Sequence, residues 1–201
     1  MTDEAAQFPW TLGGVAFTEA VMAAIDADAQ RGLTADEECC GLVTGPASDP
    51  LAADAILVFE NRANKLHAVD PETFTRTGRE YFDMHPLKFA RALDEGPKNG
   101  APVKVLYHSH IDCGAYFSPT DAAAATGNTS EPLHPLAYLV VSIRTGGLID
   151  DRKLFVWHPA TSTFVEAPFT ITRAGPPRAR HLQDARMRVR VFLAVACVLR
   201  A

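Results

Sequence analysis

The chain has 201 residues, of which 47% are hydrophobic and 21% are charged, a composition typical of a globular protein with one sizeable core. No apolar run reaches the roughly 18 residues of a membrane-spanning helix, and the acidic N-terminus lacks the basic flank of a secretory signal, so we expect a cytoplasmic protein with no membrane span. The net charge of −5 argues against a nucleic-acid enzyme, and nothing in the sequence indicates an oligomeric state.

The first third of the chain alternates between helical and extended patterns. Val21, Ile25 and neighbouring alanines recur at helical spacing, which predicts a helix over Phe17–Gly32. Two short apolar runs, Cys39–Gly45 and Ala55–Glu60, are typical of buried strands. We therefore expect a helix followed by two strands in this part of the chain.

The middle of the chain is harder to assign because polar and apolar residues are mixed. The polar segment 61–74 contains an Asp-Pro pair, so we expect a loop. Residues 79–96 have a helical pattern, although Pro86 favours a kink or two shorter helices. Four apolar residues would form the buried side of this helical segment: Phe82, Leu87, Phe89 and Leu93.

Extended patterns dominate the second half of the chain. A strand is predicted over Val103–His110, and a short helix begins at Ser118 and stops near Gly127. Further strands are expected over 136–143, 152–158 and 163–171. Helices that alternate with strands early and strands that cluster late predict one α/β domain with a mixed sheet, over residues 1–172.

Residues 173–201 differ in composition from the rest of the chain. They contain seven arginines and one aspartate, a net charge of +6, which leaves −11 on residues 1–172. The apolar run Val191–Leu199 is too short to cross a bilayer. We expect this basic, partly apolar tail to dock on a protein surface or to be disordered rather than to bind a membrane, and its role is open.

The cysteines do not form a recognisable framework. Cys39 and Cys40 are adjacent, Cys113 and Cys197 are isolated, and no CxxC spacing occurs. This pattern predicts reduced thiols rather than disulfides or a cysteine-rich zinc site.

The stretch HSHIDCGAYFSPTD, residues 108–121, concentrates metal-binding side chains after an apolar run. Side chains at positions i and i+2 of a strand project to the same side, so His108 and His110 present two imidazoles together. Imidazole suits zinc, and Asp121 is the nearest candidate for a third ligand. Ser118 and Asp121 also have the spacing of a helix N-cap, and a lone histidine pair is more often structural than metal-binding. The combination favours a metal site.

The spacing resembles that of a known family. His108-x-His110, seven residues, Ser118, two residues and Asp121 match the motif of the JAMM zinc metalloproteases, also called MPN+, JAB-domain or Mov34/MPN/PAD-1 proteins. Upstream, EECCGLVTG resembles the family segment in which a glutamate precedes a Cys-Gly pair by two residues, and Glu38 takes that position. The resemblance runs from about Phe17 to Phe155 and points to the bacterial branch of the family.

The resemblance implies a fold and a site. The fold is an α/β sandwich with a curved mixed sheet, similar to cytidine deaminases. One Zn²⁺ per chain would be held by His108, His110 and Asp121, with water as the fourth ligand. Glu38 would accept the proton of that water, and Ser118 would support the oxyanion, a set of groups that suits amide hydrolysis.

The resemblance also implies a substrate class. Bacterial members similar to this chain are linked to ubiquitin-like sulfur-carrier proteins that end in Gly-Gly. We therefore expect a zinc metallopeptidase that cleaves peptide or isopeptide bonds next to that Gly-Gly. No other cofactor is indicated, and no residue identifies the particular substrate.

Several alternatives stay open. Ile111 stands where many family members have proline, and Asp112 and Cys113 are near enough in sequence to be rival ligands or to influence the metal. A non-catalytic MPN-type interaction module is the main alternative function, although modules of that kind lack the metal ligands. A zinc deaminase needs HxE and PCxxC motifs, and neither occurs in the chain.

Overall fold

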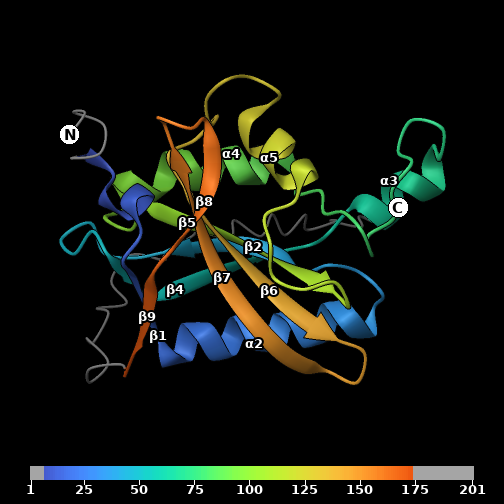
Figure 1. The fold of residues 1–201 in the computed structure, drawn as a ribbon, viewed down its shortest axis with the longest axis horizontal. Coiled ribbons are helices and arrows are strands. Elements are labelled where there is room, and N and C mark those ends of the chain that lie inside the picture. Colours follow the sequence, from blue (N-terminus) through green and yellow to red (C-terminus); the bar gives the residue numbers. More distant parts are fainter. Residues whose placement is uncertain (1–6, 174–201) are drawn as a thin grey trace, which may run out of the picture.

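The computed structural model describes residues 7–173 (Figure 1). The expectations for residues 174–201, including the apolar run Val191–Leu199, lie outside the described residues, and the domain boundary at 172 stays a prediction. None of the helices formed by residues 7–173 has the length and apolar character that crossing a membrane requires.

A six-stranded mixed sheet forms the centre of the molecule, as the sequence predicted. Its order is β4 (Ala55–Phe59), β2 (Cys40–Thr44), β5 (Val103–Ile111), β6 (Ala137–Arg144), β7 (Leu148–His158) and β8 (Thr163–Ala167). Strands β5 and β6 are parallel, and the other neighbours are antiparallel. All residues of β5 are buried, because this strand has neighbours on both sides and is covered on both faces.

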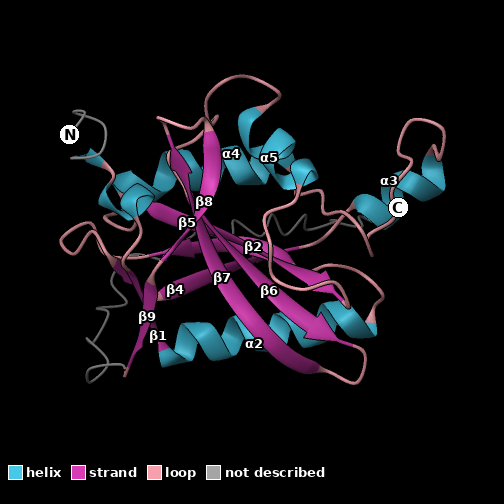
Figure 2. Ribbon diagram, viewed as in Figure 1, coloured by secondary structure: helices cyan, strands magenta, loops and turns pink. Residues whose placement is uncertain are grey.

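Helices cover both faces of this sheet (Figure 2). Helix α2 (Glu19–Thr34) lies along one face, and α4 (Pro86–Lys98) and α5 (Pro119–Thr126) lie on the other. Alternate residues of β5 separate the two cores: Val105 and Tyr107 pack on the α2 side, while Leu106 packs on the α4 and α5 side. By the same alternation, the even-numbered His108 and His110 face α5.

A smaller parallel sheet was missed by the sequence analysis. It consists of β3 (Ala52–Ala53), β1 (Val15–Thr18) and β9 (Phe169–Thr172), in that order. Phe17, expected to start the first helix, is instead a fully buried strand residue whose ring lies edge-on to Phe169 at 5.6 Å. The helix begins at Glu19 because the Thr18 hydroxyl accepts a hydrogen bond from the Val21 amide (3.2 Å) and caps it.

Proline explains two other differences from the sequence prediction. The expected strand 163–171 is divided at Pro168 into β8 and β9, which belong to different sheets. Pro86 does not kink a longer helix but begins α4, since the residue before a proline avoids helical geometry. Residues 79–85 are therefore not helical.

The middle segment contains two further corrections. Residues 61–74, expected to be a loop, include helix α3 (Ala63–Val69). Leu87, assigned to the buried side of α4, is 75% exposed, whereas Phe82, Phe89 and Leu93 pack partly against the core. Phe89 and Leu93 are four residues apart and share the inward face of α4, whereas Leu87, two residues before Phe89, lies off that face.

Candidate metal centre

The end of β5 and the first turn of α5 bring three metal-binding side chains together. His108, His110 and Asp121 are all buried, with exposed fractions of 1%, 4% and 8%. The two Nε2 atoms lie 3.2 Å apart. His108 Nε2 lies 3.3 Å from Asp121 Oδ1, and His110 Nε2 lies 3.5 Å from Asp121 Oδ2. The sequence prediction that these three residues converge is therefore matched by their positions.

The distances between these three ligand atoms fit a metal ion with tetrahedral coordination. Two ligands that each lie 2.0–2.1 Å from Zn²⁺ at a tetrahedral angle are about 3.3 Å apart, close to all three observed distances. Two imidazole nitrogens and one carboxylate oxygen form a donor set that suits Zn²⁺ and other divalent first-row metals. With three protein ligands, one tetrahedral position is left for water or substrate. The group can therefore hold a metal ion.

The second ring nitrogens of the two histidines have different surroundings. His110 Nδ1 donates a hydrogen bond to the Gly114 carbonyl (3.0 Å), which leaves the Nε2 lone pair free for a metal. His108 Nδ1 is buried with no hydrogen-bond partner, and its ring is held by the Phe82 ring at 4.8 Å. The Tyr116 ring lies edge-on to His110 at 4.8 Å. The two imidazoles are thus oriented mainly by packing and one backbone contact.

The Asp121 carboxylate both caps helix α5 and lies next to the two histidines. The Ser118 amide donates to Asp121 Oδ2 (2.8 Å), and the Asp121 amide donates to Ser118 Oγ (3.1 Å), which forms a capping box at the start of α5. Burial alone would raise the pKa of Asp121, but His108, His110 and Ser118 together lower it well below its ordinary value. The carboxyl group is therefore ionised at neutral pH, as a ligand must be.

Ser118 keeps a donor for a reacting group. Its oxygen accepts the capping hydrogen bond, but a hydroxyl has one donor and two acceptor sites. The hydrogen remains available to a substrate atom beside Asp121. The helix-cap and oxyanion interpretations of Ser118 are therefore compatible.

Glu38 reaches this site from a distant part of the chain. It lies two residues before Cys40, the first residue of β2 and the register partner of His108 on β5. The position is held by the Glu38 amide, which donates to the Gly78 carbonyl (2.7 Å), and by the adjacent Cys39 amide, which donates to Ser109 Oγ (2.8 Å). The neighbouring acid, Glu37, instead pairs with Arg31 at 3.3 Å.

The Glu38 side chain is buried, with an exposed fraction of 5%. Burial and, to a lesser extent, the charges of Asp121 and Glu80 raise its pKa to about 9, while Arg76 opposes the shift. In the metal-free site Glu38 is therefore protonated at neutral pH.

Asn61 is a buried residue that sequence reasoning missed. Its exposed fraction is 2%, and its amide nitrogen donates to the carbonyls of Glu38 (3.1 Å) and Tyr81 (2.9 Å). Its amide oxygen accepts from the amides of Ala63 and Asp83. Asn61 thus ties the segment 78–83 to the backbone of Glu38. A single asparagine in a polar segment gave no signal of this role.

The suggested rival ligands lie outside the three-residue group. Asp112 is exposed and accepts hydrogen bonds from Thr145 N (2.6 Å), Thr145 Oγ1 (2.7 Å) and Arg79 (3.0 Å). Cys113 is also exposed. Among residues 7–173, the atoms that lie within 4.8 Å of one another as a metal-binding group belong to His108, His110 and Asp121. Asp112 instead fixes the loop that follows β5.

The fold and the site define a mixed α/β protein with a candidate mononuclear metal centre at the end of a buried strand. A sequence model of the prokaryotic homologs of the JAB domain matches residues 18–157, and the chain belongs to this family. No curated protein sequence matches the chain. The predicted resemblance is therefore confirmed at the level of the family and its fold, while the likeness to cytidine deaminases stays a prediction.

Solved structures are similar to this chain at low sequence identity. A protein from Desulfitobacterium hafniense has a TM-score of 0.57 and 21% identity, over 80% of this chain and 94% of that chain, which shows a shared fold. A protein from Salinibacter ruber has a TM-score of 0.49 and 24% identity, over 81% and 94%. A JAB1/MPN domain protein from Archaeoglobus fulgidus has a TM-score of 0.47 and 11% identity, over 80% and 99%.

The raised pKa of Glu38 predicts a pH-dependent stability difference in the metal-free protein. The folded pKa of about 9 exceeds the ordinary value of 4.5, so the folded state binds a proton that the unfolded chain releases between these values. Relative to Glu38→Gln, the wild type should lose roughly 1–3 kcal/mol of unfolding free energy between pH 5.5 and 7.5. Urea unfolding with a chelator present measures this, and parallel pH profiles would contradict it.

Proposed function

We propose that this protein is a zinc-dependent hydrolase that cleaves a peptide or isopeptide bond next to the C-terminal Gly-Gly of a ubiquitin-like or sulfur-carrier protein. The proposal is carried by the distances between the ligand atoms of His108, His110 and Asp121. These distances match tetrahedral coordination of one metal ion with one coordination position left open. Glu38, a buried acid whose pKa is influenced by the charge of Asp121, is the candidate for the second requirement of hydrolysis, a proton acceptor.

The residues of the site have separate tasks in this reaction. Bound Zn²⁺ would supply a Lewis acid that brings the pKa of a water molecule to about 7. Glu38 accepts the proton of that water and then donates it to the leaving amine. The Ser118 hydroxyl donates to the developing oxyanion. Glu38 must be ionised to begin, and its pKa of about 9 falls when a cation is held nearby, since opposite charge favours the carboxylate.

The surroundings of the site support a substrate with small residues near the scissile bond. The rings of Phe82 and Tyr116 each lie 4.8 Å from an imidazole of the ligand pair. They narrow the approach to the two histidines, which favours a chain without side chains at that point. A Gly-Gly terminus meets this requirement, because glycine allows the closest approach of a backbone to a site.

Incubation of the zinc-loaded protein with sulfur-carrier fusions tests the proposal. Mass spectrometry should show cleavage directly after Gly-Gly, and a matched fusion with Ala-Ala at those positions should be cleaved more slowly. A protein that holds one zinc per chain but leaves all fusions intact would contradict the proposal. A purified protein without stoichiometric zinc would favour the non-catalytic interaction module.

A further inference from the structure

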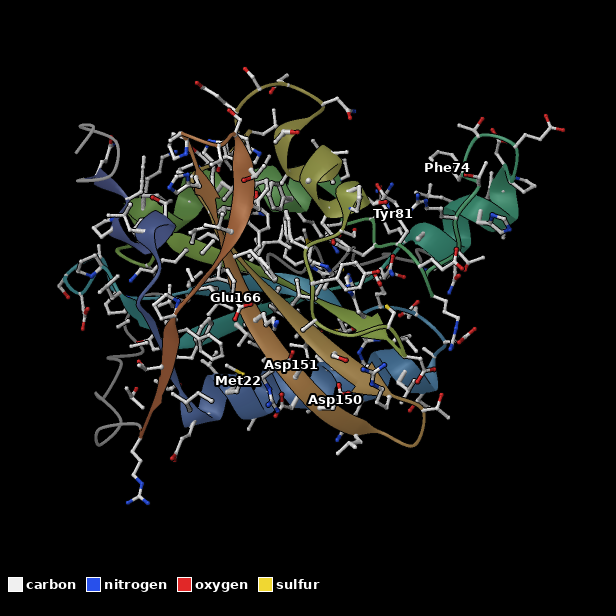
Figure 3. The ribbon with its side chains drawn as sticks, in the orientation of Figure 1. Met22, Phe74, Tyr81, Asp150, Asp151 and Glu166 are labelled. Atoms are coloured by element: carbon white, nitrogen blue, oxygen red, sulfur yellow. The ribbon has the colours of Figure 1, made fainter. Side chains whose placement is uncertain are left out.

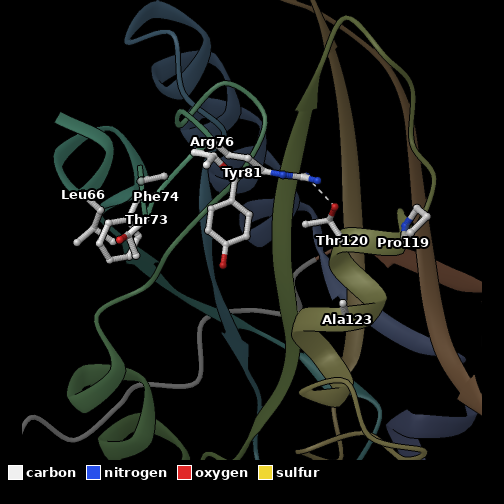
Figure 4. Close-up of a pocket in the computed structure, with 10 residues that line it drawn as sticks. Leu66, Thr73, Phe74, Arg76, Tyr81, Pro119, Thr120 and Ala123 are labelled. Carbon is white, nitrogen blue, oxygen red and sulfur yellow. Dashed lines mark hydrogen bonds between the residues drawn. The ribbon is translucent and has the colours of Figure 1, made fainter. Parts of the chain in front are cut away.

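A cavity of about 480 Å³ lies between the segment 63–81 and the start of α5 (Figure 4). Its apolar lining includes Leu66, Phe74 and Ala123. Phe74 and Tyr81 lie on the segment that joins α3 to α4 (Figure 3). Arg76 reaches across from that segment, and its Nη1 donates to the Thr120 hydroxyl at 2.7 Å. The cavity thus combines apolar walls with one cationic group.

Arg76 differs from the other arginines in its charge environment. Residues 7–173 contain eight arginines, and seven of them lie within 4.0 Å of a carboxylate: Arg31, Arg62, Arg79, Arg91, Arg144, Arg152 and Arg173. Within the same described residues, Arg76 has no such partner, and its one hydrogen bond is to Thr120. A guanidinium has five N–H donors, so most of its donors remain available to a ligand.

The cavity shares α5 and Tyr81 with the surroundings of the candidate metal centre. Thr120, which receives the hydrogen bond from Arg76, lies between Ser118 and Asp121 in the chain. Tyr81 lines this cavity and also a smaller one of about 240 Å³ that touches His108 and Asp121. The charge of Arg76 also acts on Glu38, since it opposes the rise of the Glu38 pKa. A substrate that occupied both cavities would therefore extend from the candidate metal centre to Arg76.

We propose that Arg76 binds a carboxylate of the substrate, and that the adjoining cavity holds the apolar residue that carries or neighbours this carboxylate. The proposal rests on the proposed hydrolase function and narrows its substrate class. Arginine suits a carboxylate because its planar donors match the two oxygens. The carboxylate has two sources, the α-carboxylate of a C-terminal amino acid joined to Gly-Gly, or an acidic side chain in a longer substrate.

Peptide binding to the zinc-loaded Glu38→Gln variant tests this without relying on turnover. Three dansyl-labelled peptides are compared by fluorescence anisotropy: Ala-Val-Gly-Gly-Leu with a free carboxylate, the same peptide as its amide, and the amide of Ala-Val-Gly-Gly-Asp. We expect a peptide with a free carboxylate to bind about tenfold tighter than the neutral amide, because a hydrogen bond to a charged group contributes a free energy that corresponds to at least this factor. A preference for the first peptide assigns the α-carboxylate, and a preference for the third assigns the side chain.

Three substitutions in the same background separate ligand binding from a structural role. Arg76→Gln should remove the preference for a carboxylate, and Arg76→Lys should restore part of it. Arg79→Gln is the matched control, since the guanidinium of Arg79 is already engaged by Asp36 and Asp112, and it should keep the preference. The exposed position of Arg76 predicts that the preference weakens at high salt.

The outcomes distinguish this proposal from the proposed function. Equal binding of all three peptides, no measurable binding of any, or a preference that survives Arg76→Gln would overturn the role of Arg76. The Glu38→Gln variant could show carboxylate-dependent binding while the wild type cleaves none of the peptides. That result would keep the role of Arg76 and overturn the proposed hydrolase function.

Discussion

Replacing Glu38 with glutamine is expected to leave zinc binding intact and to lower turnover by about 10²–10⁴-fold. The substitution keeps the size and hydrogen-bonding capacity of the side chain, but the amide cannot accept a proton from water. Glu38 is not one of the three residues whose ligand atoms converge, so the metal should remain. Steady-state cleavage of a fusion that wild type cleaves, together with zinc content by mass spectrometry, measures both effects.

The neighbouring glutamate provides a matched control for this substitution. Glu37 is one residue away, but its carboxylate pairs with Arg31 rather than facing Asp121. Glu37→Gln should therefore retain turnover close to that of the wild type. A Glu38→Gln variant with unimpaired turnover would refute the assigned role of Glu38 as proton acceptor.

Replacing Asp121 with asparagine is expected to lower zinc affinity by more than about 100-fold, because even the loss of a group that only orients a ligand costs 10–100-fold. Asparagine preserves the shape of the side chain and can still accept the hydrogen bond from the Ser118 amide, so α5 should keep much of its cap. Competition with a chelator, together with the zinc-to-protein ratio, measures the loss.

The serine of the capping box separates the metal-binding effect from the helix-cap effect. Ser118→Ala removes the acceptor for the Asp121 amide and should cost about 1 kcal/mol of stability, but the three ligands remain and zinc should still bind. Zinc held at wild-type affinity by Asp121→Asn would show that the carboxylate is not a ligand. The same loss of zinc in both variants would assign the effect to helix disruption.

The middle segment and the beginning of the chain show where the sequence was insufficient. Helix α3 was not predicted because residues 63–69 have no clear apolar face and end before an Asp-Pro pair. Strand β1 was not predicted because its four residues run directly into α2, and apolar residues at the junction fit both periods. A strand of that length becomes recognisable only through its partners β3 and β9.

Parts of the site were accessible from the sequence because they depend on local geometry. The spacing of His108 and His110 places them on one side of a strand whatever surrounds it, and the capping box of Ser118 and Asp121 is set by one helical turn. The family resemblance added Glu38, which no local rule assigns. The structure brings the ligand atoms of His108, His110 and Asp121 together, while the catalytic roles of Glu38 and Ser118 stay predictions.

The sequence by itself determined the two halves of the ligand set and the class of fold, since strand alternation and helix capping act over a few residues. Only the tertiary structure decided which contacts between distant parts of the chain surround this ligand set. The pairing of β2 with β5 positions Glu38, the buried Asn61 ties the segment 78–83 to it, and the cavity beside α5 brings in Arg76. Those contacts join residues far apart in the chain, and they form because burial of both faces of the sheet fixes one register.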